Sequence, residues 1–98
     1  MVIDEEPFVL DQVEAFLKQE DIFVIPVADS RQALTWLHKE NEETFDLILV
    51  NTRMPGSKDA SALFSLKPAT KKQPVDIEDF LQKPFTREQL VEFVKRKL

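Results

Sequence analysis

The sequence predicts an α/β fold with a doubly wound, mostly parallel sheet, and three observations support this prediction. Residues 47–50 (Leu-Ile-Leu-Val) form an aliphatic run typical of a strand covered on both faces, as strands of parallel sheets are. Residues 8–19 carry apolar side chains at helical spacing, and Pro7 suits the first turn of that helix because its missing N–H needs no partner there. A second amphipathic segment follows near residue 30, so strands and helices alternate, which predicts right-handed βαβ units.

Two further strands and a helix are predicted in the amino-terminal half. Residues 1–3 (Met-Val-Ile) stop at an acidic loop, as a buried strand does at its end. Residues 22–27 are mostly β-branched, but Pro26 places this strand at an edge or close to its own end, since proline cannot donate to a ladder. Ser30 is the predicted N-cap of a helix that runs to about residue 41.

The last third is predicted to begin with a loop and to end with a helix. The Pro-Gly pair at residues 55–56 marks the loop. Residues 59–66 are predicted to form a short helix, and residues 79–82 a last strand. A capping box formed by Thr86 and Gln89 begins the final helix.

Composition limits the class of protein. The 98 residues suit one domain, with a net charge of −5 and no long basic run that would neutralise nucleic-acid phosphates. The chain has no cysteine for disulfides or thiolate metal sites, and no apolar run exceeds four residues. The opening residues lack the features of a signal peptide. We therefore expect a cytoplasmic protein that binds neither nucleic acid nor membrane.

Three separated motifs resemble one family. Residues 2–7 (Val-Ile-Asp-Glu-Glu-Pro) resemble the end of a first strand with an acidic pair. Residues 46–56 resemble a third strand followed by a Met-Pro-Gly loop, and residues 80–85 (Phe-Leu-Gln-Lys-Pro-Phe) a fifth strand with a Lys-Pro step. In this order the motifs are similar to the two-component response-regulator receiver (CheY-like) family. The resemblance implies a flavodoxin-like, doubly wound parallel sheet of the (βα)5 type over residues 1–98.

The resemblance also implies a site. In that family an acidic pair and an aspartate at the end of the third strand hold magnesium, and the aspartate accepts a phosphoryl group from a histidine kinase. By position, Asp4 and Glu5 match the acidic pair, Asn51 matches the phosphoacceptor and Lys83 the lysine, which we expect to point at Asp4. Thr70 is the candidate for the switch hydroxyl.

Asn51 departs from the family pattern. A carboxamide carries no negative charge and is a poor nucleophile, so an aspartyl phosphate cannot form there. Magnesium would lose one of three anionic ligands, which leaves at best weak binding at Asp4 and Glu5. The dipole of the following helix explains these two carboxylates without any metal, and it is the favoured explanation. We expect no catalytic activity and no other cofactor.

The segment between the second and third motifs is short. Residues 57–82 number 26, whereas a helix, a strand, a second helix and a second strand need roughly 40. The proline-flanked tract 68–74 is the least helical part, so we expect the fourth-helix region to be shortened or missing. The fourth strand is then expected near residues 67–70 or 74–77, unless a segment has dropped out of the chain as given.

Two functions of different kinds remain. The leading hypothesis is a phosphorylation-independent, receiver-like signalling domain that acts through protein–protein interaction, with a histidine kinase or an output domain as its partner. The alternative is a genuine phosphoacceptor receiver that carries an Asp-to-Asn change at Asn51. A flavin or small-molecule binder is disfavoured, because a chain with one glycine has no Gly-rich phosphate loop. The oligomeric state is left open.

Overall fold

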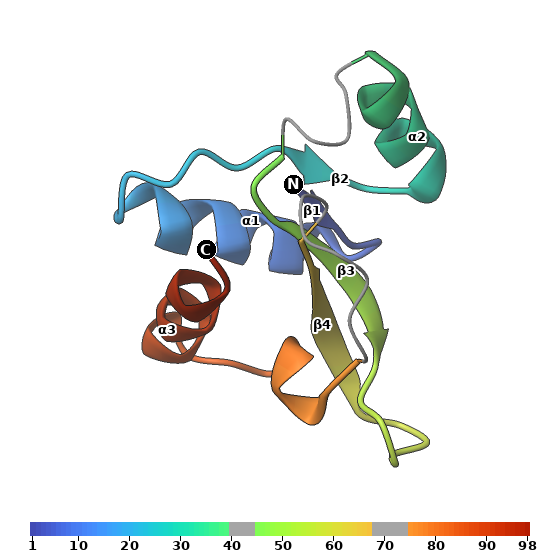
Figure 1. Cartoon of the computed structure of the whole chain (residues 1–98), viewed down its shortest axis with the longest axis vertical. Coiled ribbons are helices and arrows are strands. Elements are labelled where there is room, and N and C mark those ends of the chain that lie inside the picture. Colours follow the sequence, from blue (N-terminus) through green and yellow to red (C-terminus); the bar gives the residue numbers. More distant parts are fainter. Residues whose placement is uncertain (40–44, 68–74) are drawn as a thin grey trace.

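The computed structural model of the chain describes residues 1–39, 45–67 and 75–98. Within these ranges, three α-helices surround one five-stranded sheet (Figure 1). No helix of the described ranges combines the length and the apolar composition that a membrane span requires. In chain order the elements are β1 (Val2–Ile3), α1 (Pro7–Lys18), β2 (Pro26–Val27), α2 (Ser30–Lys39), β3 (Ile48–Arg53), β4 (Ser61–Leu66), the 3-10 helix η2 (Ile77–Asp79), β5 (Phe80–Gln82) and α3 (Arg87–Lys97).

The sheet has the strand order β2-β1-β3-β4-β5, which is the flavodoxin-like order that the resemblance implies. β1 pairs in parallel with both β2 and β3. β4 pairs antiparallel with β3 and with β5. Four strands therefore run in one direction and β4 runs in the other, so the sheet is mostly but not wholly parallel.

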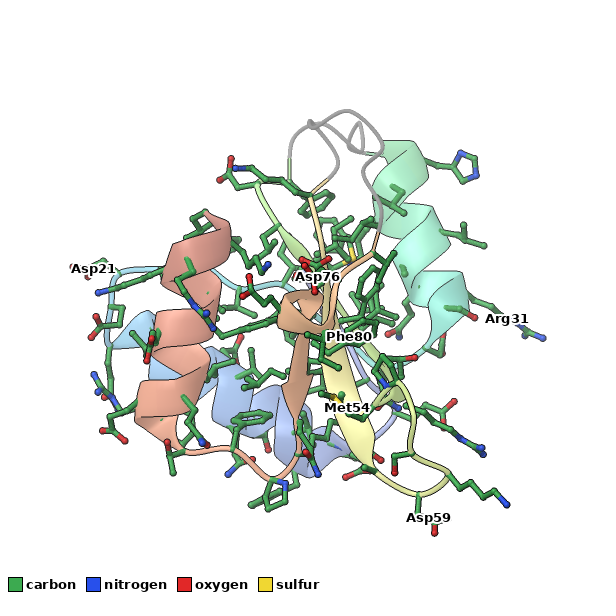
Figure 2. All side chains as sticks on the ribbon, turned by 60° about the horizontal axis from the view of Figure 1, so that its bottom comes forward. Asp21, Arg31, Met54, Asp59, Asp76 and Phe80 are labelled. Carbon is green, nitrogen blue, oxygen red and sulfur yellow. The ribbon has the colours of Figure 1, made fainter. Side chains whose placement is uncertain are left out.

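The reversal of β4 corrects the prediction of a short helix at residues 59–66. The predicted (βα)5-type pattern with a shortened fourth-helix region therefore departs from the family pattern earlier, between β3 and β4. Only residues 54–60 join β3 to β4, and a parallel crossover needs about ten or more. The chain turns back instead, with Gly56 at a φ of +82° and Met54 N donating to Ala60 O at 2.8 Å. Asp59 lies on this hairpin loop, away from the helices (Figure 2). The crossover helix between the third and fourth strands is thus replaced by a hairpin.

The fourth strand also lies elsewhere than expected. It was predicted near residues 67–70 or 74–77, but residues 61–66 form it. Residues 67, 75 and 76 belong to no helix or strand. The expected loss of the fourth-helix region and the candidate Thr70 fall on residues 68–74, which lie outside the described residues.

The predicted starts of α1, α2 and α3 agree with the structure, with one change of cap. Pro7 is in the first turn of α1, and the capping box of α3 is present, with Gln89 N donating to Thr86 Oγ1 at 3.1 Å. Ser30, however, is the first residue of α2 and not its cap. The Asp29 side chain accepts from Gln32 N at 2.9 Å, because its carboxylate reaches the free N–H groups of the first turn.

The strand boundaries differ more than those of the helices. β2 covers only the last two residues of the predicted strand 22–27, and β3 extends to Arg53, beyond the predicted end at residue 50. β5 begins one residue later than predicted, because η2 occupies the preceding turn. Strand length is set by pairing with neighbouring strands, which apolar runs do not specify.

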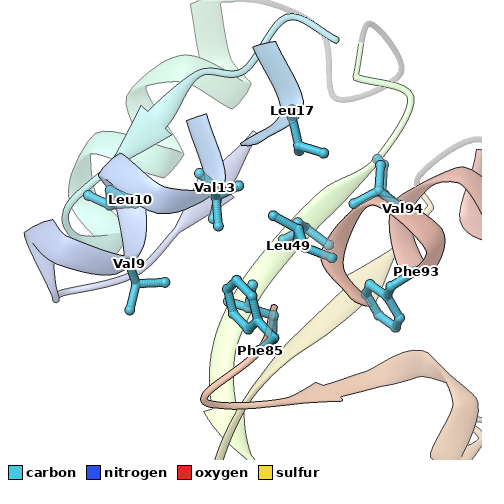
Figure 3. Close-up of a cluster of buried hydrophobic side chains, with 12 residues drawn as sticks. Val9, Leu10, Val13, Leu17, Leu49, Phe85, Phe93 and Val94 are labelled. Carbon is cyan, nitrogen blue, oxygen red and sulfur yellow. The ribbon is translucent and has the colours of Figure 1, made fainter. Parts of the chain in front are cut away.

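Alternating side chains divide the core into one cluster on each face of the sheet. The larger cluster joins the sheet to α1 and α3; Figure 3 shows Val13 of α1 and Val94 of α3 on either side of Leu49. The smaller cluster joins the opposite face to α2. Because Val2 and Leu49 face α1 and α3, the next residues on the same face are Asp4 and Asn51. The larger cluster consists of Val2, Val9, Leu10, Val13, Leu17, Leu47, Leu49, Leu63, Phe85, Leu90, Phe93 and Val94, and the smaller of Met1, Val27, Ala33, Phe45 and Ile48.

Glu20, just after α1, links this helix to α3. Its carboxylate accepts from Lys95 Nζ at 2.6 Å and from Arg87 Nη2 at 2.9 Å. The hydrogen bond and the charge of Lys95, and after them those of Arg87, hold the pKa of Glu20 below its usual range. A carboxylate with a lowered pKa in the folded state stabilises the fold above its unfolded pKa. This stabilisation is lost as the pH falls through the lowered pKa.

We therefore expect the melting temperature to decrease at pH values below about 4.3, in part because Glu20 becomes protonated. The substitution Glu20→Gln should flatten this part of the pH profile. Thermal melts between about pH 3 and pH 7 measure the effect. The matched control is Glu92→Gln, which changes an exposed carboxylate of α3. Identical pH profiles for the two variants would show that the Glu20 contacts do not stabilise the fold.

Candidate functional site

Strand register brings Asp4, which directly follows β1, side by side with Asn51, in the second half of β3, toward the carboxyl ends of the parallel strands. Val2 pairs with Leu49 and Ile3 with Val50, so Asp4 is the next residue in line with Asn51. The Asp4 N–H donates to Val27 O at 3.0 Å, which fixes its backbone against β2. In doubly wound sheets, binding sites lie at this end of the strands.

Lys83 reaches the same site from the edge of the sheet formed by β5. It follows β5, and its N–H donates to Ser61 O at 2.8 Å, which holds its backbone at the start of β4. Its Nζ donates to Asp4 Oδ2 at 2.5 Å and to Asn51 Oδ1 at 2.9 Å. The peptide bond from Lys83 to Pro84 is cis. One ammonium thus bridges residues of the first and third strands, and we call Asp4, Asn51 and Lys83 the lysine cluster.

The ion pair in the lysine cluster is shielded from water. The Asp4 side chain is 0% exposed and the Lys83 side chain 10%. The second carboxylate oxygen of Asp4, Oδ1, accepts from Glu6 N at 2.9 Å. Both oxygens therefore have donors, as a buried carboxylate requires. Asn51 is exposed, so the cluster opens to solvent at the amide.

Comparison with known proteins identifies the family. The family model described as the response regulator receiver domain matches residues 1–76. The chain belongs to the receiver-domain family. No curated protein and no solved structure gives a significant match. The match includes Asp4, Glu5 and Asn51 but ends before β5, so the position of Lys83 rests on the geometry of the lysine cluster.

Two candidate site residues of this receiver domain remain, Glu5 and Thr70. Glu5 is exposed to solvent, one residue beyond the ion pair. Thr70 lies outside the described residues. Sequence reasoning anticipated a contact between Lys83 and Asp4 but missed the contact between Lys83 and Asn51. The amide oxygen, an acceptor beside a cation, is the feature that could have indicated it.

The oxygen atoms available as metal ligands at this end of the receiver domain do not fit a tightly held magnesium ion. Magnesium prefers charged oxygen ligands, but here Asp4 Oδ2 and Asn51 Oδ1 both accept from an ammonium, and the Asn51 amide is neutral. Within residues 1–39, 45–67 and 75–98, no group of three His, Cys, Asp or Glu side chains is placed to hold a metal. Weak binding at Asp4 and Glu5 stays a prediction.

The lysine cluster also offers no accessible carboxylate for phosphoryl transfer. Asn51 lacks the nucleophilic oxygen, and Asp4 is fully buried with both oxygens engaged. The charges of Asp4 and Lys83 cancel, and Asn51 adds none. The cluster is therefore neutral without a bound cation.

Proposed function

We propose that this receiver domain is a phosphorylation-independent signalling module that acts by binding another protein. The observation that supports the proposal is the double contact of Lys83 with Asp4 Oδ2 and Asn51 Oδ1. An ammonium held by a buried carboxylate and a neutral amide needs neither magnesium nor a phosphoryl group for charge balance. A site of this kind stabilises a single conformation of the domain, and phosphorylation is not needed to reach that conformation.

The proposed module is residues 1–98 as one domain, in the cytoplasm and without enzymatic activity. Its partner is a signalling protein, either a histidine kinase or an output domain of the kind that receiver domains generally contact. The net charge of −5 disfavours direct binding to nucleic acid. The alternative is a genuine phosphoacceptor receiver that carries an Asp-to-Asn change at Asn51. It predicts that the variant Asn51→Asp accepts a phosphoryl group and then changes conformation.

Millimolar magnesium is expected to leave the melting temperature of this chain unchanged. A ligand that binds only the native state raises stability by RT ln(1 + [Mg]/Kd), and the neutral lysine cluster offers little affinity. Thermal melts with magnesium and with a chelator measure this effect. Treatment with acetyl phosphate and magnesium, followed by mass spectrometry, should show no mass gain of one phosphoryl group.

The matched control for both measurements is the variant Asn51→Asp, which restores a carboxylate at the same position. A magnesium-dependent rise of several degrees in the melting temperature of the unsubstituted chain would contradict the proposal. A phosphoryl adduct on that chain would contradict it as well. An adduct on the unsubstituted chain would mean that a carboxylate at a position other than 51 accepts the phosphoryl group.

A further inference from the structure

A groove lies at the end of the sheet opposite the lysine cluster. It has a volume of about 930 Å³ and wraps around the amino-terminal ends of the parallel strands. Its walls come from the last turns of α1, the loop before β2, α2 and the segment before β3. Six apolar residues that line it are Leu17, Ile22, Phe23, Val24, Trp36 and Phe45.

The rim of the groove has apolar side chains that no described part of the chain covers. Phe23 is 87% exposed, the largest exposed fraction among the large hydrophobic residues of the described chain. Trp36 and Ile22 are only partly buried and continue the apolar wall inward. Contiguous exposed apolar surface with aromatic residues is typical of protein–protein contact sites.

The charged side chains that line the groove are all acidic. They are Glu14, Asp21 and Asp46, and each is exposed. Asp21 lies on the outer side of the loop that follows α1 (Figure 2). The α-ammonium of Met1 also lies in the groove and donates to Leu47 O at 3.1 Å. Burial lowers its pKa to about 6, against the opposing effect of the nearby Asp46 carboxylate, and the three carboxylates outnumber this single amino group.

We propose that this groove binds a segment of a partner protein that presents apolar side chains flanked by lysine or arginine. The apolar floor takes the hydrophobic side chains, and the three carboxylates face the flanking cations. The inference rests on the proposed function, because it gives the interaction module its contact surface. It places that surface away from the lysine cluster.

Other occupants fit the groove less well. A small-molecule pocket usually has polar groups that converge on the ligand, whereas Glu14, Asp21 and Asp46 are exposed side chains at the surface. Nucleic acid is disfavoured because its phosphates would face these carboxylates. A second copy would bring together two chains that each carry a net charge of −5.

The test uses two fluorescently labelled peptides and the full 98-residue chain. One peptide combines leucine and lysine at helical spacing, and the other has glutamate in place of each lysine. Fluorescence anisotropy should show binding of the lysine peptide that is at least about tenfold tighter than that of the glutamate peptide, a difference of about 1.4 kcal/mol. The difference should shrink as salt is added.

Matched variants locate the binding surface. Phe23→Ser should weaken binding of the lysine peptide about tenfold, as loss of an aromatic anchor does. Phe8→Ser changes another exposed phenylalanine, outside the groove lining, and should have no effect. Glu14→Lys should weaken binding, and Asp11→Lys, on the same helix but outside the groove lining, should weaken it far less. All four positions are exposed, so melting temperatures should stay close to that of the unsubstituted chain.

Several outcomes would overturn the inference. Equal binding of the two peptides, or equal losses in the groove variants and their controls, would show that the groove does not select a basic apolar segment. Self-association in sedimentation velocity that Phe23→Ser abolishes would assign the surface to a second copy. Saturable binding of an apolar dye at Phe23, without peptide binding, would assign it to a small molecule.

The inference and the proposed function fail in different ways. If acetyl phosphate modifies the chain while the lysine peptide still binds the groove, the proposed phosphorylation independence is contradicted and the proposed docking site is supported. If the chain stays unmodified and the peptide does not bind, the docking site falls and the contact surface of the module lies elsewhere.

Discussion

Replacement of Lys83 by methionine is expected to lower the free energy of unfolding by about 3–5 kcal/mol, because it leaves the buried Asp4 carboxylate without its cation. The Asp4 side chain is 0% exposed, so water cannot take the place of the ammonium without rearrangement of the site. For a domain of this size, each 1 kcal/mol corresponds to roughly 4–8 °C in melting temperature. The melting temperature at neutral pH should therefore fall by more than about 12 °C.

Two controls separate the loss of the ion pair from the loss of a lysine. Lys58→Met removes an exposed lysine from the β3–β4 loop and should change stability by less than about 0.5 kcal/mol. The double variant Asp4→Asn with Lys83→Met removes both charges and should be more stable than Lys83→Met alone. A Lys83→Met variant as stable as Lys58→Met would mean that the ion pair does not stabilise the folded chain in solution.

Local sequence signals predicted α1, α2 and α3 well, because the physical causes are local, whereas the strand order was implied by the family resemblance. The capping box at Thr86 and Gln89 satisfies two backbone donors within four residues, so it can be recognised from spacing alone. Pro7 and the apolar stripe of α1 act in the same way. Residues 47–50 identified the central strand because a continuous aliphatic run must be covered on both faces.

The reversed strand β4 was missed because its cause is not local. The apolar residues of 59–66 suit a helix as well as a strand, and short apolar runs do not distinguish the two. The connection at residues 54–60 was the deciding feature, since it is too short for a crossover and Gly56 accepts the positive φ of the turn. The length of this connection, and not the apolar periodicity of the segment, therefore sets the direction of β4.

The site residues and the groove differ in how far the sequence could reveal them. The proximity of Asp4 and Asn51 follows from the parallel pairing of two strands, whereas the approach of Lys83 was expected only from the family resemblance. The groove was not predicted. Its walls come from segments far apart in the sequence, such as Glu14 and Trp36, and its shape follows from their packing.

The substitution Asn51→Asp is expected to make the stability of this receiver domain depend on magnesium. Lys83 Nζ lies 2.9 Å from Asn51 Oδ1, so a carboxylate there shares one ammonium with Asp4. In the presence of a chelator at neutral pH, repulsion between the two carboxylates should lower the free energy of unfolding of the variant by about 1–4 kcal/mol. This is the range for unit charges about 4 Å apart, from the dielectric constant of bulk water to that near a protein surface. Magnesium should restore about 2.7 kcal/mol at one hundred times its Kd.

Thermal melts of the variant with and without magnesium measure this dependence. The control Asn51→Leu adds no charge and should not respond to magnesium. Adding Glu5→Gln to Asn51→Asp removes one of three carboxylates and should weaken the response. If Asn51→Asp is neither destabilised in chelator nor rescued by magnesium, positions 4, 5 and 51 do not form a shared cation site.

Asn51→Asp is expected to gain magnesium binding without gaining a large conformational switch. A phosphodonor should be able to modify the restored carboxylate, because Lys83 lies beside it. However, β3 passes directly into β4 through residues 54–60, and the two strands pair from Ile48 with Leu66 to Arg53 with Ser61. A displacement of the segment that follows Asn51 would have to break the hydrogen bonds between β3 and β4. This requires more free energy than displacing a separate loop or helix. Amide chemical shifts should therefore change on phosphodonor treatment only near Asp4, position 51 and Lys83, and shifts that spread to α2 and α3 would show that a switch survives in this shortened domain.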